Sequence, residues 1–146
     1  MAIFLDTGFF TGFYHPKDSH HLESVQIFRA LSQGEYGLIY TSPYIISETA
    51  TLLLIRTNNN QNLLADFFSD LYGTTKFVSI LPWSSEIEQK TWAFFRKHNK
   101  SVKTKEKLMS FTDASNVIYC RDYQIEEIAT YDSHFDGILT RVLSES

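Results

Sequence analysis

Residues 2–10, AIFLDTGFF, decide the fold of this chain, because a continuous apolar run ends abruptly at an acid. The first four residues, Ala2–Leu5, lack the polar alternation of a half-exposed strand, which favours a strand buried in a parallel sheet. In open α/β sheets, ligands bind beyond the carboxyl ends of the strands. The segment therefore predicts a central strand that places Asp6 at the functional edge of the sheet.

Strand and helix patterns alternate along the rest of the chain. Further strand patterns lie at Tyr36–Tyr40, Lys76–Leu81, Glu127–Thr130 and, as a candidate fifth strand, Arg141–Leu143. Helical patterns run from Leu22 to a stop at Gly34, from Pro43 to about Arg56, from Gln61 to Tyr72, from Ser85 to about Lys97, and onward from Ser110 or Thr112. This order predicts a three-layer α/β/α fold with a central parallel sheet of four to five strands, in one domain covering residues 1–146.

Capping residues precede three of these helical patterns. Asp18 or Ser19 suits the N-cap of the first helix, and Ser42 suits that of the helix opened by Pro43. Ser85 and Glu88 have the spacing of a capping box. These residues predict where the helices begin.

Composition indicates an ordinary globular domain. The 146 residues are 43% hydrophobic and 21% charged, without low-complexity tracts. Cys120 is the only cysteine, which excludes an internal disulfide and a thiolate zinc site and favours a cytoplasmic protein. No signal-peptide pattern opens the chain, and the longest apolar run, Leu52–Ile55, is too short to span a membrane, so no membrane partner is expected.

Charge is unevenly distributed. The net charge of −4 counts against a protein that binds a polyanion. Six of the 13 lysines and arginines nevertheless fall in one short segment: Arg96, Lys97, Lys100, Lys103, Lys105 and Lys107. This basic segment, residues 96–107, is either a solvated loop with extended lysines or a patch that binds nucleic-acid phosphates.

Four of the 17 acids have unusual surroundings. Asp6 and Asp132 follow apolar strand patterns, Asp113 lies in the first turn of the last expected helix, and Glu48 is a lone charge within the apolar stretch 44–52. Each position also fits an ordinary role, as a helix cap, a complement to a helix N-terminus or a solvent-facing charge. Strand ends and helix starts can converge on one edge of a parallel sheet, which favours a shared site.

Clustered carboxylates repel one another unless protons or a cation neutralise them. Mg²⁺ and Mn²⁺ prefer oxygen ligands and keep bound water available for chemistry. Such an ion lowers the pKa of bound water and stabilises charge on an attacked phosphate. The four acids therefore predict a metal-dependent phosphodiesterase.

Four segments together resemble the motifs of PIN domains in order and spacing: AIFLDTGFF (2–10), SPYIISETATLLL (42–54), SFTDASNVIYC (110–120) and IATYDSHFD (128–136). The resemblance covers essentially the whole chain, and members of similar size include the VapC toxins of toxin–antitoxin pairs. It implies a Mg²⁺- or Mn²⁺-dependent endoribonuclease, with RNA as substrate, a cognate antitoxin protein as a possible partner and a homodimeric assembly. A PIN fold that only binds RNA or a partner protein is the alternative.

The resemblance also assigns roles to residues. It makes Asp6, Asp113 and Asp132 the metal ligands, and gives Glu48 a water-mediated ligand role or the task of orienting the attacking water. Thr130 matches a hydroxyl that would hydrogen-bond a carboxylate or the scissile phosphate. Lys103, Lys105 and Lys107, which lead into the helix that carries Asp113, are candidate phosphate contacts.

One position departs from the family pattern. The family often has Asn or Ser where this chain has Gly8, so one hydrogen bond near the metal is expected to be missing. Asp18 and His21 also resemble a family pair, for which capping and packing are the expected roles. Asp136 is expected to be a cap or surface charge, and the spacing of the histidines, His134 among them, indicates no metal cluster.

Two other enzyme classes fit poorly. Haloacid-dehalogenase-type phosphatases need a second aspartate two positions after the first, where this chain has Gly8. Dinucleotide-binding domains need a glycine-rich turn after the first strand, and the sequence from Asp6 to Phe10 has none.

Overall fold

The structure, a computed structural model, describes residues 1–142, and its strands form one parallel sheet. The strands are β1 (Ala2–Leu5), β2 (Leu38–Thr41), β3 (Ser79–Ile80), β4 (Glu127–Ala129) and β5 (Thr140–Arg141). Their order is β3-β2-β1-β4-β5, and every neighbouring pair is parallel. The predicted parallel sheet is confirmed; Leu143, the end of the expected fifth strand, lies outside the described residues.

β1 lies at the centre of this sheet. It pairs with β2 on one side and with β4 on the other, so that Phe4 stands opposite both Tyr40 and Ile128. Ile3, Phe4 and Leu5 are completely buried, because helices cover both faces of the sheet. The unbroken apolar run therefore identified the central strand correctly.

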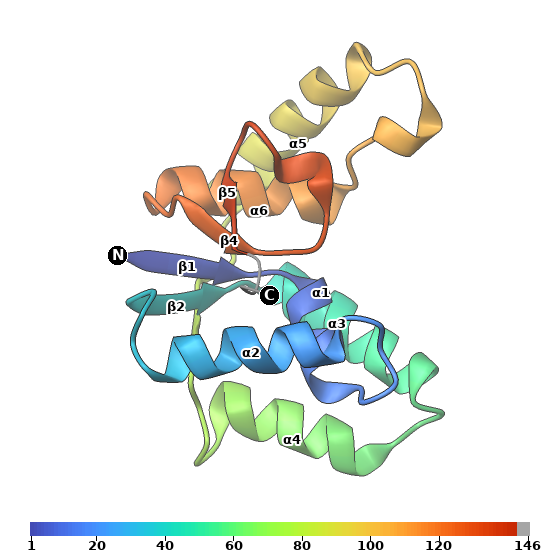
Figure 1. Ribbon diagram of the computed structural model, residues 1–146. Helices are drawn as coiled ribbons and strands as arrows, with labels where there is room; N and C mark the ends of the chain where they lie inside the picture. Colours follow the sequence, from blue (N-terminus) through green and yellow to red (C-terminus); the bar gives the residue numbers. More distant parts are fainter. Residues whose placement is uncertain (143–146) are drawn as a thin grey trace.

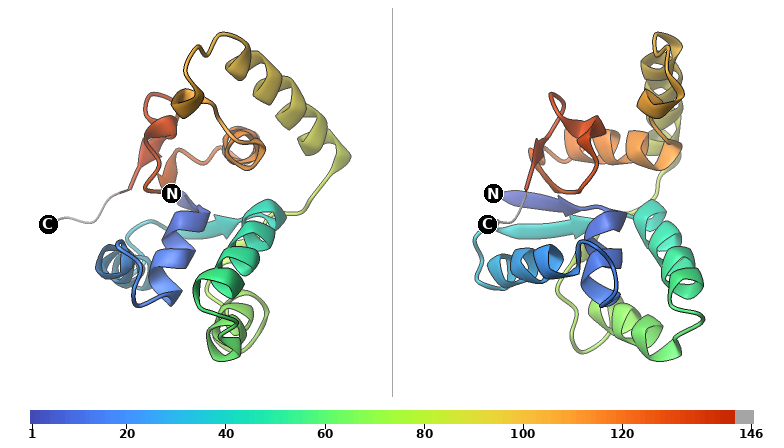
Figure 2. Two further views of the ribbon diagram at one scale, coloured as in Figure 1. Left: turned by 90° about the vertical axis from the view of Figure 1, so that its right-hand side faces the viewer. Right: turned by 45° about the vertical axis from the view of Figure 1, so that its right-hand side comes forward.

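The helices are α1 (Thr7–Tyr14), α2 (His21–Ser32), α3 (Pro43–Arg56), α4 (Gln61–Tyr72), α5 (Ser85–Lys100) and α6 (Phe111–Asp122), with short 3₁₀ helices η1 (Lys105–Lys107) and η2 (Ser133–Phe135). Figure 1 shows α5 and α6 on one side of β1 and β2, with α2 and α4 on the other, and the turned views in Figure 2 agree. The arrangement is the predicted three-layer α/β/α fold. In Figure 1, β1 points toward α1, which marks the carboxyl edge of the sheet.

α1 was not predicted from the sequence. Its residues, TGFFTGFY, contain two glycines and no polar face, and six of the eight are buried. Gly12 fits there because a Cβ at this position would lie 2.5 Å from the Ser24 hydroxyl of α2. Packing between α1 and α2, rather than helical periodicity, therefore stabilises this helix.

Some predicted boundaries were wrong by one or two residues. The N-cap of α5 is Ser84, whose hydroxyl accepts from the Ile87 N–H, so the predicted capping box of Ser85 and Glu88 was wrong. The N-cap of α2 is His20, with no side-chain capping bond; Asp18 instead accepts from the His20 backbone N–H. Strand β2 begins at Leu38 rather than Tyr36, after Gly37 with φ of 75°. Ser42 caps α3 as expected, and Ser110 caps α6, whose start was predicted near Ser110 or Thr112.

None of the helices in residues 1–142 combines the length and apolar composition that a membrane crossing requires.

Candidate active site

A cavity of ≈ 630 Å³ opens at the carboxyl edge of the sheet, and all four predicted acids line it. Asp6 follows β1, Glu48 lies in α3, Asp113 lies in the first turn of α6, and Asp132 caps η2. Four elements that are distant in sequence thus place a carboxylate in one cavity. The predicted convergence of these four residues is observed.

Asp6 is the most deeply placed of these acids, with 6% of its surface exposed. Its carboxylate accepts hydrogen bonds from the Thr7 N–H at 2.8 Å, the Asn116 amide at 3.1 Å and the Thr130 hydroxyl at 2.7 Å. Burial raises the pKa of Asp6, while these three donors act in the opposite direction. The position of Asp6 is thus fixed from three sides before any ligand arrives.

The surroundings of Asp113 strongly raise the pKa of its carboxyl. Burial, followed by repulsion from the charges of Asp6 and Asp132 and a smaller repulsion from Glu48, raises the pKa of Asp113 to about 8. The Ser110 hydroxyl accepts from the Asp113 backbone N–H at 3.1 Å, which fixes the first turn of α6. The fold therefore holds the Asp113 carboxyl among negative charges, as a cation-binding site would require.

Thr130 joins two of the acids. Its hydroxyl donates to Asp6 and accepts from the Asp132 backbone N–H at 3.1 Å, and the residue is 1% exposed. Of the two roles expected for this hydroxyl, the structure shows the contact with a carboxylate. A further contact of Thr130 with the scissile phosphate stays a prediction.

His134 lies with its ring against the acid cluster, although the spacing of the histidines indicates no metal role for it. Its Nδ1 is 3.1 Å from Asp132 Oδ1 and 3.9 Å from Asp113 Oδ2. Its Nε2 is 2.9 Å from the Glu106 carbonyl oxygen, which can only accept, so Nε2 carries the proton. The buried Nδ1 faces the two carboxylates: in the charged ring it would donate to Asp132, and in the neutral ring it has no hydrogen-bond partner.

Two further residues of the site could not be recognised from sequence. Asn116 is completely buried in α6 and its amide supports Asp6, but nothing in the sequence separates it from other helical asparagines. Arg56 ends α3 and lines the cavity, although from sequence it was only the last residue of a helix. His134 was also missed as a candidate ligand, although its place two residues after Asp132 is a signal that the sequence offers.

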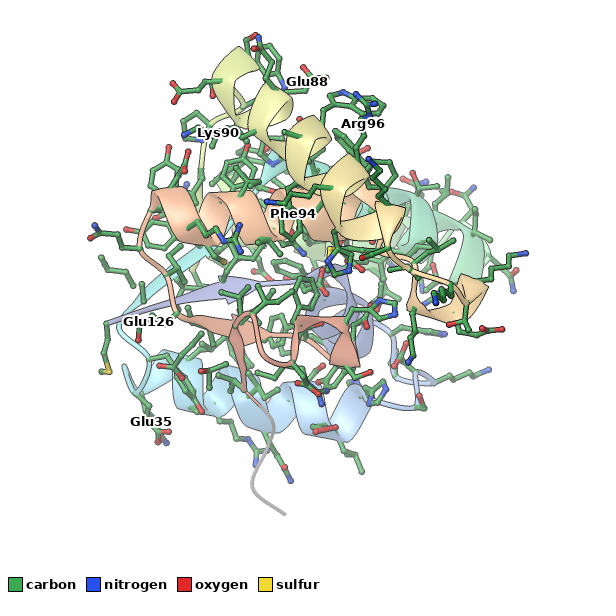
Figure 3. The ribbon with its side chains drawn as sticks, turned by 90° about the horizontal axis from the view of Figure 1, so that it is seen from above. Glu35, Glu88, Lys90, Phe94, Arg96 and Glu126 are labelled. Carbon is green, nitrogen blue, oxygen red and sulfur yellow. The ribbon has the colours of Figure 1, made fainter. Side chains whose placement is uncertain are left out.

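The basic segment lies beside the cavity rather than in its wall. Lys103, Lys105 and Lys107 are exposed and do not line the cavity. The segment begins on the last turns of α5, which crosses α6 in Figure 3 with Phe94 and Arg96 labelled on it. It continues through η1 and reaches the carboxyl side of the sheet. The His134 contact with the Glu106 carbonyl joins η1 to the acid cluster. Phosphate binding by these lysines stays a prediction.

The remaining polar candidates have structural partners. Asp136 forms two hydrogen bonds with the Arg141 guanidinium and is largely exposed, which agrees with the expected surface role. His21 contacts the Gly12 carbonyl oxygen through Nδ1 at 2.8 Å, which agrees with local packing. Asp18 accepts from His20 and also lines the cavity.

The acids of the cavity, together with His134 next to its wall, fit a divalent cation. One carboxylate oxygen each from Asp113 and Asp132 and a ring nitrogen of His134 lie within 4.8 Å of one another. The raised pKa of Asp113 and the unpartnered Nδ1 of His134 are both features that a bound cation would satisfy.

Comparisons with known proteins agree with this description. Residues 3–138 match the PIN domain family. A VapC ribonuclease of Archaeoglobus fulgidus is 33% identical over 135 residues, which cover 92% of this chain and 80% of that protein.

Solved structures share the fold. VapC20 of Mycobacterium tuberculosis, a sarcin–ricin-loop-cleaving toxin, has a TM-score of 0.78 at 20% identity, covering 97% of this chain and 98% of that one. VapBC2 of Rickettsia felis, bound to a promoter DNA fragment, gives 0.67 at 14% identity over 97% and 98% of the two chains. FitAcB of Neisseria gonorrhoeae gives 0.60 at 16% identity over 95% of each.

Proposed function

Because this chain belongs to the PIN domain family, we propose that it is a VapC-like ribonuclease that hydrolyses RNA phosphodiester bonds with a divalent cation. The observation that carries the proposal is the convergence of Asp6, Glu48, Asp113 and Asp132 on one cavity. A protein without a cation site would gain nothing from placing the Asp113 carboxyl among negative charges that raise its pKa to about 8.

In this proposal, Asp6, Asp113 and Asp132 hold Mg²⁺ or Mn²⁺, and the free Nδ1 of His134 is available as a further ligand. The ion supplies a water of lowered pKa and positive charge at the attacked phosphate. Thr130 and Asn116 keep the Asp6 carboxylate oriented through their hydrogen bonds.

We assign to Glu48 the task of orienting the attacking water. It enters the cavity from α3, whereas Asp6, Asp113 and Asp132 come from the ends of strands and the start of α6. From that wall its carboxylate orients a water for in-line attack and accepts a proton from it. As the water oxygen bonds to phosphorus, the bond between phosphorus and the 3′ oxygen breaks, and this oxygen takes a proton from solvent. The products are a 5′-phosphate and a 3′-hydroxyl.

Lys103, Lys105 and Lys107 are assigned to the RNA backbone outside the cavity. Their exposed positions on the loop and on η1, beside the acid cluster, suit ionic contacts with phosphates. Such contacts offset the repulsion between RNA and an acidic cavity on a chain of net charge −4.

The proposal also covers the protein partners of this chain. We assign the chain a cognate antitoxin, since the structural relatives include VapBC2, and a homodimeric state in the cytoplasm. Exposed apolar side chains on neighbouring helices, Ile55 of α3 with Phe68 and Tyr72 of α4, are available for such contacts. Sedimentation of the purified protein tests the homodimer: a monomer at micromolar concentration contradicts it.

The activity is tested with labelled total RNA incubated with the protein in Mn²⁺ and, separately, in a chelator. The proposal expects discrete fragments with 5′-phosphate ends in Mn²⁺ alone. Fragments of equal yield in the chelator would contradict metal dependence, and fragments with 5′-hydroxyl ends would contradict the direction of cleavage.

A further inference from the structure

Two aromatic rings lie face to face at the mouth of the acidic cavity. The rings of His20 and Tyr131 have centroids 3.9 Å apart and planes 6° apart, and both residues line the cavity. The Tyr131 hydroxyl lies 2.6 Å from the Ser24 hydroxyl, and the His20 backbone N–H donates to Asp18 at 2.8 Å. The Tyr131 ring is therefore held through its hydroxyl and His20 through its backbone, while the His20 ring has its Nδ1 3.5 Å from Glu23 Oε2.

The outer face of this pair is open. Tyr131 is partly buried, whereas 45% of the His20 side chain is exposed although one face of its ring is covered by Tyr131. The uncovered face of the His20 ring is the accessible one.

Gly8 explains why Tyr131 can take this position. A Cβ at Gly8 would lie 3.2 Å from Cδ2 of Tyr131, closer than ordinary van der Waals contact. The Asn or Ser that PIN domains often have here would bring this Cβ against the ring. The glycine that departs from the family pattern thus removes a polar side chain and makes room for an aromatic one.

The same cavity has one strongly basic side chain. Arg56 is its sole lysine or arginine among the described residues, alongside five acids. Its guanidinium lies 4.0 Å from Asp18, the residue that also accepts from His20, and 49% of the side chain is exposed. Guanidinium groups bind phosphate oxygens through paired N–H donors.

We propose that His20, stacked on Tyr131, binds one nucleobase of a single-stranded RNA, and that Arg56 binds a phosphate of the same strand next to the bond being cut. This subsite rests on the proposed ribonuclease function and adds to it an unpaired nucleotide as substrate. Base stacking on aromatic rings tolerates every base, so the subsite selects for an unstacked nucleotide rather than for a sequence.

The test compares His20→Leu, which removes the ring, with His20→Phe, which keeps it. The probe is a labelled single-stranded RNA decamer containing a site that the wild type cuts in Mn²⁺. We expect KM to rise roughly 10-fold for His20→Leu with kcat changed less than about 3-fold, and His20→Phe to stay near wild type. Tyr123→Leu, which removes an exposed aromatic ring outside the cavity, is the matched control.

Decamers with one abasic nucleotide then identify the stacked base. At one position beside the cut, base removal should raise KM for the wild type roughly 10-fold and leave KM for His20→Leu unchanged. Arg56→Gln should raise KM and reduce the salt dependence of binding by the amount expected for about one phosphate, whereas Arg29→Gln should not.

The outcomes separate two failures. If the wild type cuts RNA and His20→Leu has a wild-type KM, or if base removal affects both proteins equally at every position, the subsite is overturned and the ribonuclease stands. If the wild type cuts no RNA in Mn²⁺, the proposed function fails and the subsite fails with it.

Discussion

The Thr130 hydroxyl donates a hydrogen bond to the Asp6 carboxylate over 2.7 Å and so ties the end of β4 to the end of β1. The same oxygen accepts from the Asp132 backbone N–H. One buried side chain therefore sets the relative position of two of the proposed metal ligands.

Replacing this hydroxyl should weaken metal binding. Thr130→Val keeps the shape but leaves an Asp6 oxygen and the Asp132 N–H without their partner, at a cost of about 1–3 kcal/mol in the free energy of unfolding. Mn²⁺ affinity, measured by calorimetry, should fall roughly 10- to 100-fold. Thr130→Ser should retain both properties. Equal Mn²⁺ affinity of the valine variant and the wild type would show that Thr130 does not position Asp6.

Asp113 should make the metal-free protein less stable as pH rises. Its pKa is raised from 3.8 to about 8, so its neutral form is favoured in the folded state, and the stability this gives below pH 4 is lost as pH rises through about 8. In a chelator, Asp113→Asn should therefore melt above the wild type at pH 9, by several degrees, with no difference near pH 4. Melting curves across this range test the sign, and a lower melting temperature of the variant at pH 9 would contradict it.

His134 should influence which metal is preferred. Imidazole nitrogen suits Mn²⁺ and later transition metals better than Mg²⁺, which favours oxygen. His134→Ala should lower Mn²⁺ affinity roughly 10-fold and Mg²⁺ affinity much less. His98→Ala is the matched control, since His98 lies on α5 outside the cavity. Parallel losses for the two ions would mean that His134 acts only through Asp132.

The exposed lysines of the basic segment should bind RNA through ionic interactions. Neutralising Lys103, Lys105 and Lys107 together should weaken RNA binding and reduce the slope of log affinity against log salt by roughly 0.7 for each phosphate that these lysines neutralise. Arg29→Gln with Lys76→Gln is a control for charge removed elsewhere. An unchanged slope in the triple variant would mean that these lysines do not bind RNA phosphates, and that the segment is exposed to solvent or contacts a protein partner.

Sequence was sufficient for the sheet and the four acids because both depend on local patterns. β1 is an unbroken apolar run, and Asp6 and Asp132 follow strands, so their meeting at one edge follows from parallel topology. α1 was missed because its helix depends on burial against α2, which no periodicity in TGFFTGFY reveals.

The residues missed at the site depend on tertiary contacts. The role proposed for His134 depends on the Glu106 carbonyl, 28 residues earlier, whose contact places a proton on Nε2. Arg56 and His20 both contact Asp18, a residue that the sequence indicated only as a helix cap. The sequence showed that Gly8 departs from the family pattern. It did not show why, because the ring that a side chain at this position would meet belongs to Tyr131, which follows β4.

The most direct test of the account is cleavage of labelled total RNA in Mn²⁺ by the wild type, Asp113→Asn and Asp136→Asn. Asp113 lies among the clustered charges of the cavity, whereas Asp136 is an exposed acid paired with Arg141, so the two variants make the same chemical change at different places. The account predicts metal-dependent cleavage by the wild type and Asp136→Asn, and a loss of at least about 100-fold for Asp113→Asn. Equal cleavage by all three proteins would contradict the placement of the catalytic centre in this cavity.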